Sequence, residues 1–250
     1  MKRLASPLLF AAAALLAGCG SGGDGNGSAP SAPAGSVKAV AAPAGSDWTQ
    51  QVRQTPEGGF VMGNPDAPLK LVEYGSRLCP TCGALAREGY DPLTKNYVNT
   101  GKVSFEFREF MVHGPADFPP ALLGNCVDKA AFFPVLEQMF HDQAQFDDGL
   151  TKMTPAQQQA LQGAKPVQVF KALADAEGII PYMKQRGLTQ AKIDQCMTDQ
   201  AMIDKFTKTT QDKTADGTVK GTPTVLINGK VADNAITWPQ VEAALKAAGA

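Results

Sequence analysis

A strand pattern meets a helix pattern in the run Glu73-Tyr74-Gly75-Ser76-Arg77-Leu78-Cys79-Pro80-Thr81-Cys82. Apolar and polar side chains alternate from Leu69 to Tyr74, which is typical of a strand. Gly75-Ser76 ends this strand. Pro80 suits the first position of a helix, because the backbone N–H that proline lacks has no partner there. We therefore expect Cys79 to stand at the N-terminus of a helix.

The flanking sequence gives the order of the remaining elements. The helix is expected to run towards Val98, and the segment from Lys102 to Phe110 reads as a second strand, which makes a β-α-β unit. Apolar residues then recur at helical spacing through a block at about 117–213. Asn228-Gly229 is a strong hairpin signal, and a last helix is expected after Thr237. The strands expected on either side of that turn are 225–227 and 230–232.

The cysteine spacing predicts a division of labour between two sulfurs. The N-terminus of a helix stabilises negative charge, because its first N–H groups lack partners and its dipole is positive. We therefore expect a lowered pKa for Cys79, which makes it the reactive sulfur, and we expect Cys82 to resolve the mixed disulfide. Pro80 and Thr81 link the two cysteines. Arg77 either adds positive charge near Cys79 or is a solvated loop residue.

A pair of cysteines at this spacing, taken alone, indicates either redox chemistry or metal binding. Glu73, six residues before Cys79, has two readings as well. If the strand buries this carboxylate, it is strained as an ion and can relay protons to Cys82. If it faces outward, it is an ordinary solvated residue. Strand alternation leaves both readings open.

The first 18 residues read as an export signal. Lys2-Arg3 supplies positive charge, and the apolar run that follows is too short for a comfortable transmembrane helix. The segment Leu16-Ala17-Gly18-Cys19 resembles a bacterial lipobox, which implies cleavage before Cys19 and lipidation of its thiol. The alternative is ordinary signal cleavage nearby, which leaves Cys19 a free thiol. By analogy, Gly20 after this cysteine favours the outer membrane.

Residues 19–46 are expected to form a flexible linker. All but six of these 28 positions are Gly, Ala, Ser or Pro, a composition that buries too little apolar surface to offset its ordering entropy. As a Gly-rich coil the segment would span roughly 30 Å. The folded part is expected to occupy 47–250, as a monomer.

Composition excludes two classes of protein. Hydrophobic residues make up 44% of the 250 residues, which is too low for a bundle of membrane helices. The net charge of -1 contains no basic excess, and the two Trp and four Tyr residues form no stacking array. We therefore expect no nucleic-acid partner.

The run from Glu73 to Cys82, together with Gly221-Thr222-Pro223-Thr224, resembles the DsbA-like thioredoxin-fold proteins. The resemblance covers roughly residues 47–250. It implies an α/β thioredoxin fold, β-α-β then β-β-α, with an inserted helical domain at about 117–213. It also implies a cis peptide bond before Pro223, facing the cysteines, and backbone pairing of Thr222 with an extended substrate peptide. The family has a buried acid at the position of Glu73, which favours the relay role.

One position departs from the best-known member of that family, which has His where this chain has Thr81. A cation between the cysteines stabilises the reduced form and makes a strong oxidant. Thr81 lacks that charge, whereas the helix dipole and Pro80 remain. We therefore expect an oxidant, but a weaker one.

Two further cysteines, Cys126 and Cys196, fall in the expected helical block. They could form a second redox pair, a structural disulfide, or half of a four-thiolate zinc site with Cys79 and Cys82. Cys126 and Cys196 lack the close spacing in sequence that paired zinc ligands have, which counts against a zinc site. The resemblance favours the structural disulfide, because related sequences often carry such a pair. We expect no metal and no other cofactor.

The remaining candidate side chains are expected to be structural. We expect His113 in a loop at the boundary of the insertion and His141 on a helix surface, because neither lies near the cysteine pair in sequence. Three phenylalanines are expected in the core rather than in a peptide groove: Phe132, Phe133 and Phe140.

The resemblance and the export signal together predict a function. The chain is expected to be a thiol–disulfide oxidoreductase on the periplasmic side of a bacterial membrane, which introduces disulfides into reduced exported proteins through the Cys79–Cys82 disulfide. A membrane redox partner would reoxidise the dithiol. The alternatives are a reductase or isomerase that uses the same centre, and a non-enzymatic metal-binding thiol protein.

Overall fold

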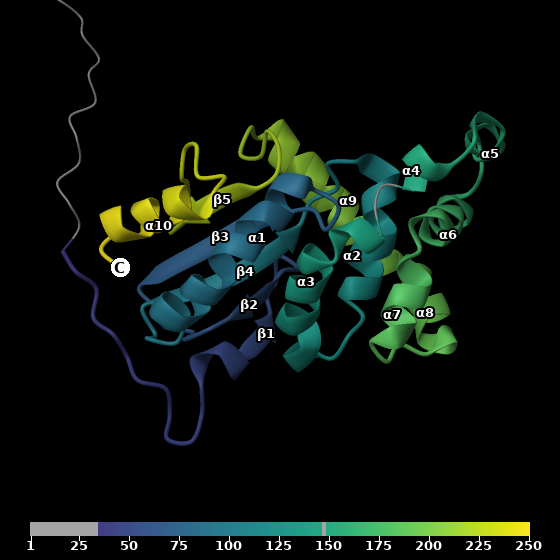
Figure 1. The fold of residues 1–250 in the computed structure, drawn as a ribbon. Coiled ribbons are helices and arrows are strands. Elements are labelled where there is room, and N and C mark those ends of the chain that lie inside the picture. Colours follow the sequence, from purple (N-terminus) through teal and green to yellow (C-terminus); the bar gives the residue numbers. More distant parts are fainter. Residues whose placement is uncertain (1–34, 147–148) are drawn as a thin grey trace, which may run out of the picture. The chain divides into compact units, whose positions relative to one another are not determined.

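A computed structural model describes residues 35–146 and 149–250 (Figure 1). These residues belong to a single unit that spans 33–250. The expected signal at 1–18, the expected lipidation site Cys19 and the first part of the expected linker lie outside them. Among the described residues, no helix is both long enough and apolar enough to cross a membrane.

A six-stranded sheet forms the centre, with strand order β1-β2-β4-β3-β5-β6. Strands β3 and β4 are parallel and pair from Leu69↔Val103 to Gly75↔Glu109, whereas the other neighbouring strands are antiparallel. Gly75 and Glu109 therefore lie side by side at the edge of the sheet where the cysteine motif follows. The strands are β1 Val52–Gln54, β2 Phe60–Met62, β3 Leu69–Gly75, β4 Val103–Glu109, β5 Thr224–Ile227 and β6 Lys230–Val231.

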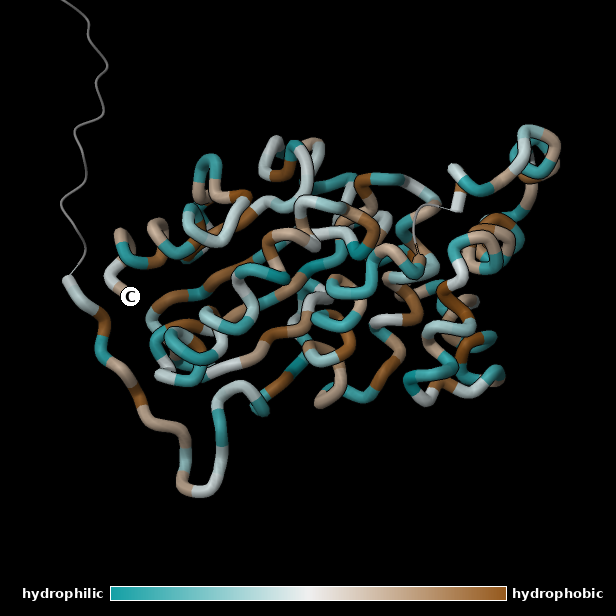
Figure 2. Tube along the Cα trace, viewed as in Figure 1, coloured by the Kyte–Doolittle hydropathy of each residue, from teal (hydrophilic) through white to brown (hydrophobic). Residues whose placement is uncertain are grey.

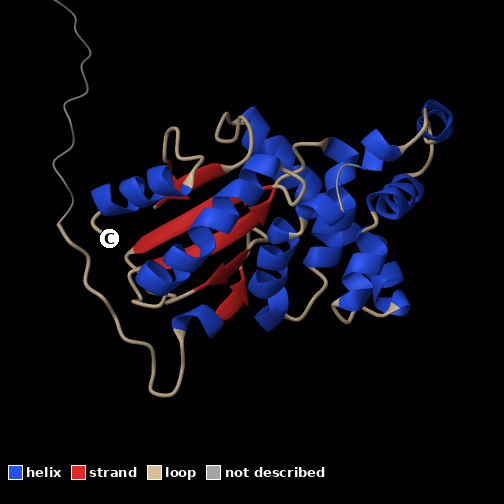
Figure 3. Cartoon of the chain, viewed as in Figure 1, coloured by secondary structure: helices blue, strands red, loops and turns tan. Residues whose placement is uncertain are grey.

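Helices supply all the regular structure described between β4 and β5 (Figure 3). Helices α1 and α10 lie along the sheet, and α4 to α8 gather beyond one end of it (Figure 1). The main helices are α1 Pro80–Leu93, α2 Phe118–Gly124, α3 Phe132–His141, α4 Gly149–Lys152, α5 Pro155–Ala160, α6 Pro166–Glu177, α7 Ile179–Gln185, α8 Gln190–Met197, α9 Gln200–Ala215 and α10 Trp238–Ala247. A π-helical turn, Thr94–Val98, extends α1, and short 3₁₀ turns include η3 Gly114–Asp117 and η5 Gln143–Gln145.

The element order confirms the predicted fold class. A β-α-β half and a β-β-α half share one sheet, and a helical insertion separates them. Helical structure begins at Gly114 and ends at Ala215, close to the expected block at about 117–213. The sequence did not predict β1 and β2, because three-residue strands are too short to show an alternating pattern.

Helix α3 belongs to two apolar cores. One of its faces packs with the sheet and α1, through Phe132, Phe133, Leu136 and Phe140. Another face packs inside the insertion, through Val135 and Met139. Figure 2 shows hydrophobic colours along the central strands and the inner helices. Burial of one such phenylalanine contributes about 2 to 3 kcal/mol, and the expected core positions of Phe132, Phe133 and Phe140 are confirmed.

The last part of the expected linker is held against the domain, and we call residues 37–46 the N-terminal strap. Val37 N donates to Gly249 O at 2.7 Å, and Val40 N donates to Thr100 O at 2.9 Å. Trp48 Nε1 donates to Val40 O at 2.7 Å. Part of the predicted linker, which extends to residue 46, therefore contacts the domain. The composition of this segment supplies too little apolar surface for a core of its own. The packing of Val37 against the domain and a few backbone hydrogen bonds are nevertheless enough to attach the segment.

Candidate active site

The cysteine pair occupies the first turn of α1. Cys79 is the N-cap residue, with φ -70° and ψ 117°, and Pro80 follows at the first helical position. Cys82 N donates to Cys79 Sγ at 3.4 Å, so the sulfur takes the place that a serine or aspartate oxygen holds at other helix starts. Both thiols are free. The predicted position of Cys79 at a helix N-terminus is confirmed.

The two thiols have opposite acidities. A hydrogen bond from the Cys82 thiol is the largest cause that lowers the pKa of Cys79 to about 5, and the backbone N–H groups of Cys82 and Thr81 add to it. Burial raises the pKa of Cys82 well above its usual value. Cys79 is 6% exposed and Cys82 is 0% exposed. Near neutral pH, Cys79 is therefore the thiolate and Cys82 the protonated thiol.

A second loop brings a backbone carbonyl group close to the reactive sulfur. The Thr222–Pro223 peptide bond, just before β5, is cis, as the resemblance implied. Cys79 Sγ lies 3.3 Å from Thr222 O. The loop before β5 and the start of α1 thus meet at one end of the sheet, 143 residues apart in sequence.

Glu73 is buried behind the cysteines. It lies in the middle of the sheet, paired with Phe107 on β4 and Val225 on β5, and is 5% exposed. Burial is the largest cause that raises the pKa of Glu73 to about 8, and the negative charge of Cys79 adds to it. Its Oε1 has no hydrogen-bond partner among the described residues. The outward-facing reading of Glu73 is therefore wrong.

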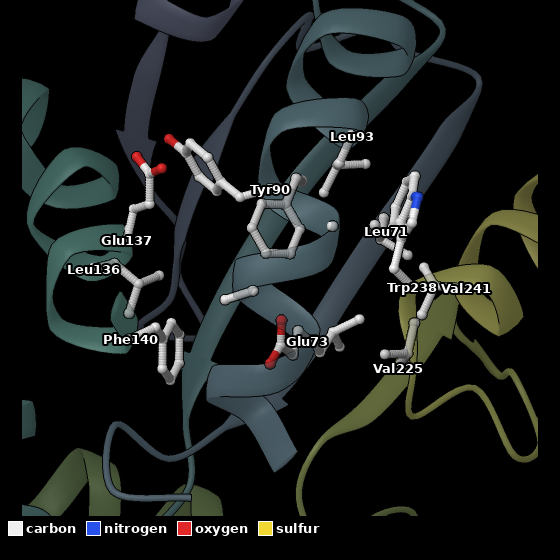
Figure 4. Close-up of a pocket in the computed structure, with 14 residues that line it drawn as sticks. Leu71, Glu73, Tyr90, Leu93, Leu136, Glu137, Phe140, Val225, Trp238 and Val241 are labelled. Carbon is white, nitrogen blue, oxygen red and sulfur yellow. The ribbon is translucent and has the colours of Figure 1, made fainter. Parts of the chain in front are cut away.

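The Glu73 carboxyl lines a small cavity between the sheet, α1, α3 and α10 (Figure 4). Its volume of about 40 Å³ is enough to hold a water molecule. Most of its lining is apolar and includes Leu136, Phe140 and Trp238, with a second carboxyl group, Glu137, also at the wall. This apolar surrounding explains why the charged form of Glu73 is disfavoured.

Arg77 anchors the turn before the cysteines from inside the protein. Its side chain is fully buried, and Nε and Nη2 each lie 2.8 Å from Glu109 Oε1. Nη1 donates to Met139 Sδ at 3.0 Å, and the guanidinium lies over the rings of Phe107 and Phe132. The reading of Arg77 as a solvated loop residue is therefore wrong. Its guanidinium is paired with the buried carboxyl group of Glu109.

The residue before Arg77 is held in the same way. Ser76 Oγ donates to Asp117 Oδ1, and Leu78 N donates to Ser76 Oγ at 3.0 Å. His113 Nδ1 lies 3.0 Å from Asp117 Oδ1. His113 is thus in a loop at the start of the insertion, as expected, and it also contacts the turn that precedes the cysteines.

A family model described as "Thioredoxin" matches residues 55–247. This chain belongs to the thioredoxin family. The match covers five of the six strands, β2 to β6, together with the cysteine motif, the helical insertion and all of α10.

Relatives of this thioredoxin-family chain include both solved structures and curated proteins. A protein-disulfide isomerase from Novosphingobium aromaticivorans is 30% identical, with a TM-score of 0.70 over 75% of this chain and 95% of that one. BdbD from Bacillus subtilis has a TM-score of 0.55 at 20% identity, over 80% of this chain and 97% of that one. Disulfide bond formation protein D of Bacillus subtilis is 31% identical over 90 residues, 35% of this chain. The chain spans about 40% of the length of that curated relative.

The second cysteine pair of this thioredoxin-family chain is bonded. Cys126, after α2, and Cys196, near the end of α8, form a disulfide with a Cα–Cα distance of 6.2 Å and a sequence separation of 70. Because these sulfurs are joined to each other, the four-thiolate zinc reading is wrong. In the described part of the chain, no group of three or more His, Cys, Asp or Glu side chains could hold a metal ion.

Sequence reasoning missed the side chains that hold the active-site turn. Glu109, Asp117 and Gln143 lie 32, 41 and 66 residues from their partners in this turn. None of them belongs to a motif. The remaining histidine, His141, is exposed at the end of α3, as expected.

Proposed function

We propose that this chain is an exported protein thiol–disulfide oxidoreductase that introduces disulfides into reduced proteins through a Cys79–Cys82 disulfide. The observation that carries the proposal is the asymmetry of the pair. One sulfur is an acidic thiolate beside the cis-peptide loop, and the other is a buried thiol next to a buried carboxyl. This arrangement suits stepwise exchange with a peptide at Cys79.

The exchange balances over two steps. A substrate thiolate attacks Cys79 Sγ of the disulfide, the Cys79–Cys82 bond breaks, and Cys82 leaves as a thiolate. A second substrate thiolate then attacks the substrate sulfur of the mixed disulfide, and Cys79 leaves as a thiolate. The substrate loses two electrons and gains a disulfide, and the protein becomes a dithiol. A low pKa makes Cys79 a good leaving group in the second step.

We propose that Glu73 supplies the proton that Cys82 needs. Cys82 leaves as a thiolate in a site whose burial favours the neutral thiol, and the carboxyl of Glu73 interacts with it directly. A carboxyl with a pKa of about 8 is largely protonated at neutral pH and can donate. The cavity beside Glu73 offers space for water to return the proton.

The direction of exchange follows from which redox state the site stabilises. A stabilised Cys79 thiolate favours the dithiol form, so the disulfide form is an oxidant. Thr81 supplies no cation to strengthen this effect. The relative from Novosphingobium aromaticivorans is named as a protein-disulfide isomerase, which makes isomerisation by the same centre the second candidate.

We further propose that reduced exported proteins are the substrates and that a membrane redox partner reoxidises the dithiol. The backbone of Thr222 would pair with an extended substrate peptide next to Cys79. The lipobox-like segment supports attachment through a lipid on Cys19, on the periplasmic side of the outer membrane. Metabolic labelling with a radioactive fatty acid tests this attachment, and loss of label in Cys19→Ser is the expected result.

The decisive experiment traps the intermediate in cells. Replacing Cys82 with Ala should leave mixed disulfides at Cys79, visible as reducible adducts that disappear in the Cys79→Ala/Cys82→Ala variant. Absence of adducts from the exported proteome would overturn the oxidoreductase proposal. A redox titration against glutathione then separates directions, because a potential near the roughly -270 mV of thioredoxin would contradict the oxidant proposal.

A further inference from the structure

Gln143, in the helical insertion, reaches into the active-site turn. Its Nε2 donates to Arg77 O at 3.0 Å and to Cys79 O at 2.9 Å. Gln143 is half-buried and begins the 3₁₀ turn η5, just after α3. One side-chain amide therefore binds the carbonyl groups on both sides of Leu78.

The first turn of α1 is shaped to receive this amide. Gly83 faces Gln143, and a Cβ atom at position 83 would collide with Gln143 Oε1. Arg87, one turn further along α1, donates to Phe140 O at 2.7 Å and lies 3.4 Å from Gln143 Oε1. The donor end of Gln143 thus holds the turn, while its acceptor end faces α1.

One of these two carbonyl groups belongs to Cys79 and is part of its backbone conformation. The carbonyl of Cys79 defines its ψ, which is the extended value of 117° that an N-cap residue requires. In this conformation Cys79 Sγ lies 3.4 Å from Cys82 N. Cys79 O also accepts from Gly83 N, at 3.0 Å, so Gln143 and α1 fix the same oxygen from two directions.

We propose that Gln143 is a positioning residue that holds the backbone of Cys79 in the conformation in which its sulfur accepts the N–H groups of the helix start. Gln143 touches neither sulfur and acts through the turn. The inference deepens the proposed function, since it assigns to the helical insertion a part in setting the redox potential of the Cys79–Cys82 pair.

The test compares Gln143→Met with Gln145→Met. Methionine has nearly the length of glutamine and no donor, and Gln145 is an exposed residue of the same 3₁₀ turn. Three quantities are measured on each purified protein: the pKa of Cys79 from thiolate absorbance, the redox potential against glutathione, and the melting temperature.

We expect Gln143→Met to raise the pKa of Cys79 and to make the disulfide less oxidising by about tenfold, which is about 30 mV. Gln145→Met should match the parent protein. Gln143→Glu, which replaces the donor with a negative charge, should shift both quantities further in the same direction.

A merely structural role predicts another pattern. If Gln143→Met and Gln143→Glu lower the melting temperature but keep the parent pKa and potential, Gln143 only attaches the insertion and the inference is overturned. Both redox readouts use small molecules, so they do not depend on whether protein adducts form at Cys79 in cells. Failure of the trapping experiment therefore leaves this test intact.

Discussion

Cys79 and Cys82 stand three residues apart at the start of a helix, whereas Cys126 and Cys196 stand 70 residues apart and are bonded within the helical insertion. The first pair meets helix N–H groups, a cis-peptide loop and a buried carboxyl group. Cys196 packs among the apolar side chains of the insertion, and Cys126 lies at their margin. The surroundings of a cysteine therefore decide whether its sulfur takes part in disulfide exchange or stays in one disulfide bond.

The two pairs also differ in what they do for the fold. Closure of a short loop by the Cys79–Cys82 bond removes little chain entropy, whereas a bond across 70 residues removes about 4 kcal/mol of it. Loop closure by the reactive pair therefore adds little to the stability of the fold. The distant pair is expected to contribute mainly to stability. Substitutions at either pair test this contrast.

Removal of the reactive sulfur has the largest expected effect. Cys79→Ala should reduce oxidation of a reduced two-cysteine peptide to the rate without protein, because no other sulfur accepts the first attack. The matched control is Cys126→Ala/Cys196→Ala, which should keep the parent rate at a temperature where it is folded. Residual oxidation by Cys79→Ala above the background rate would mean that the distant pair is also redox-active.

Removal of the buried carboxyl should change the pH dependence of stability. In the reduced protein the pKa of Glu73 is about 8, above its ordinary 4.5, so the folded state holds a proton that the unfolded state releases between these values. Stability from this group is full below pH 4.5 and is lost as the pH rises through 8. Relative to the parent, Glu73→Gln should gain up to about 5 kcal/mol between pH 4 and pH 9.

Denaturant titrations of both reduced proteins at several pH values measure this difference. The comparison with the parent is needed because Cys79 acts in the opposite sense to Glu73. The lowered pKa of Cys79 adds stability as the pH rises through about 5, and this contribution is present in both proteins. Glu137→Gln, at the wall of the same cavity but far less buried, is the control and should show a smaller change. If the free energy of unfolding depended on pH in the same way in the parent and in Glu73→Gln, the assigned effect of Glu73 burial would be contradicted.

Loss of the distant disulfide should cost stability and nothing else. Cys126→Ala/Cys196→Ala is expected to lower the free energy of unfolding by about 4 kcal/mol, which lowers the melting temperature by roughly 10 °C in a domain of this size. The potential of the Cys79–Cys82 pair, measured on the same preparation, should equal that of the parent. A changed potential would show that the two pairs are coupled.

The smallest expected effect comes from the residue between the reactive cysteines. Thr81 is exposed, so histidine fits there without displacing the core. Thr81→His should place positive charge near the Cys79 thiolate and make the disulfide more oxidising by about tenfold, or about 30 mV. Thr81→Gln, which adds bulk without charge, should leave the potential unchanged. Equal potentials for both variants would rule out charge as the cause.

Features read from local spacing were predicted well. The cysteine motif, its helix start and the hairpin at Asn228-Gly229 each occupy a few consecutive residues. The cis bond at Pro223 came from the resemblance, as did the choice of the Cys126–Cys196 disulfide, and both are present. Burial of Glu73 could be settled only by the register of three strands, which no single strand specifies.

Features that depend on tertiary contact were not predictable. Arg77 looks like a surface residue in sequence, and only its contacts with Glu109, Met139 and two phenylalanine rings make it a buried anchor. Gln143 begins a 3₁₀ turn in a polar stretch and has no sequence signal at all. The partners of such residues lie tens of positions away, so their role appears only when the insertion is folded against the sheet.

The N-terminal strap has a consequence for how an anchored protein would work. Its backbone partners are Thr100, just before β4, and Gly249, just after α10, whereas Cys79 follows the opposite end of β3 (Figure 1). A seven-residue strand puts about 20 Å between those two ends. The strap therefore joins the domain at the end of the sheet away from Cys79, and its own residues leave the reactive sulfur uncovered.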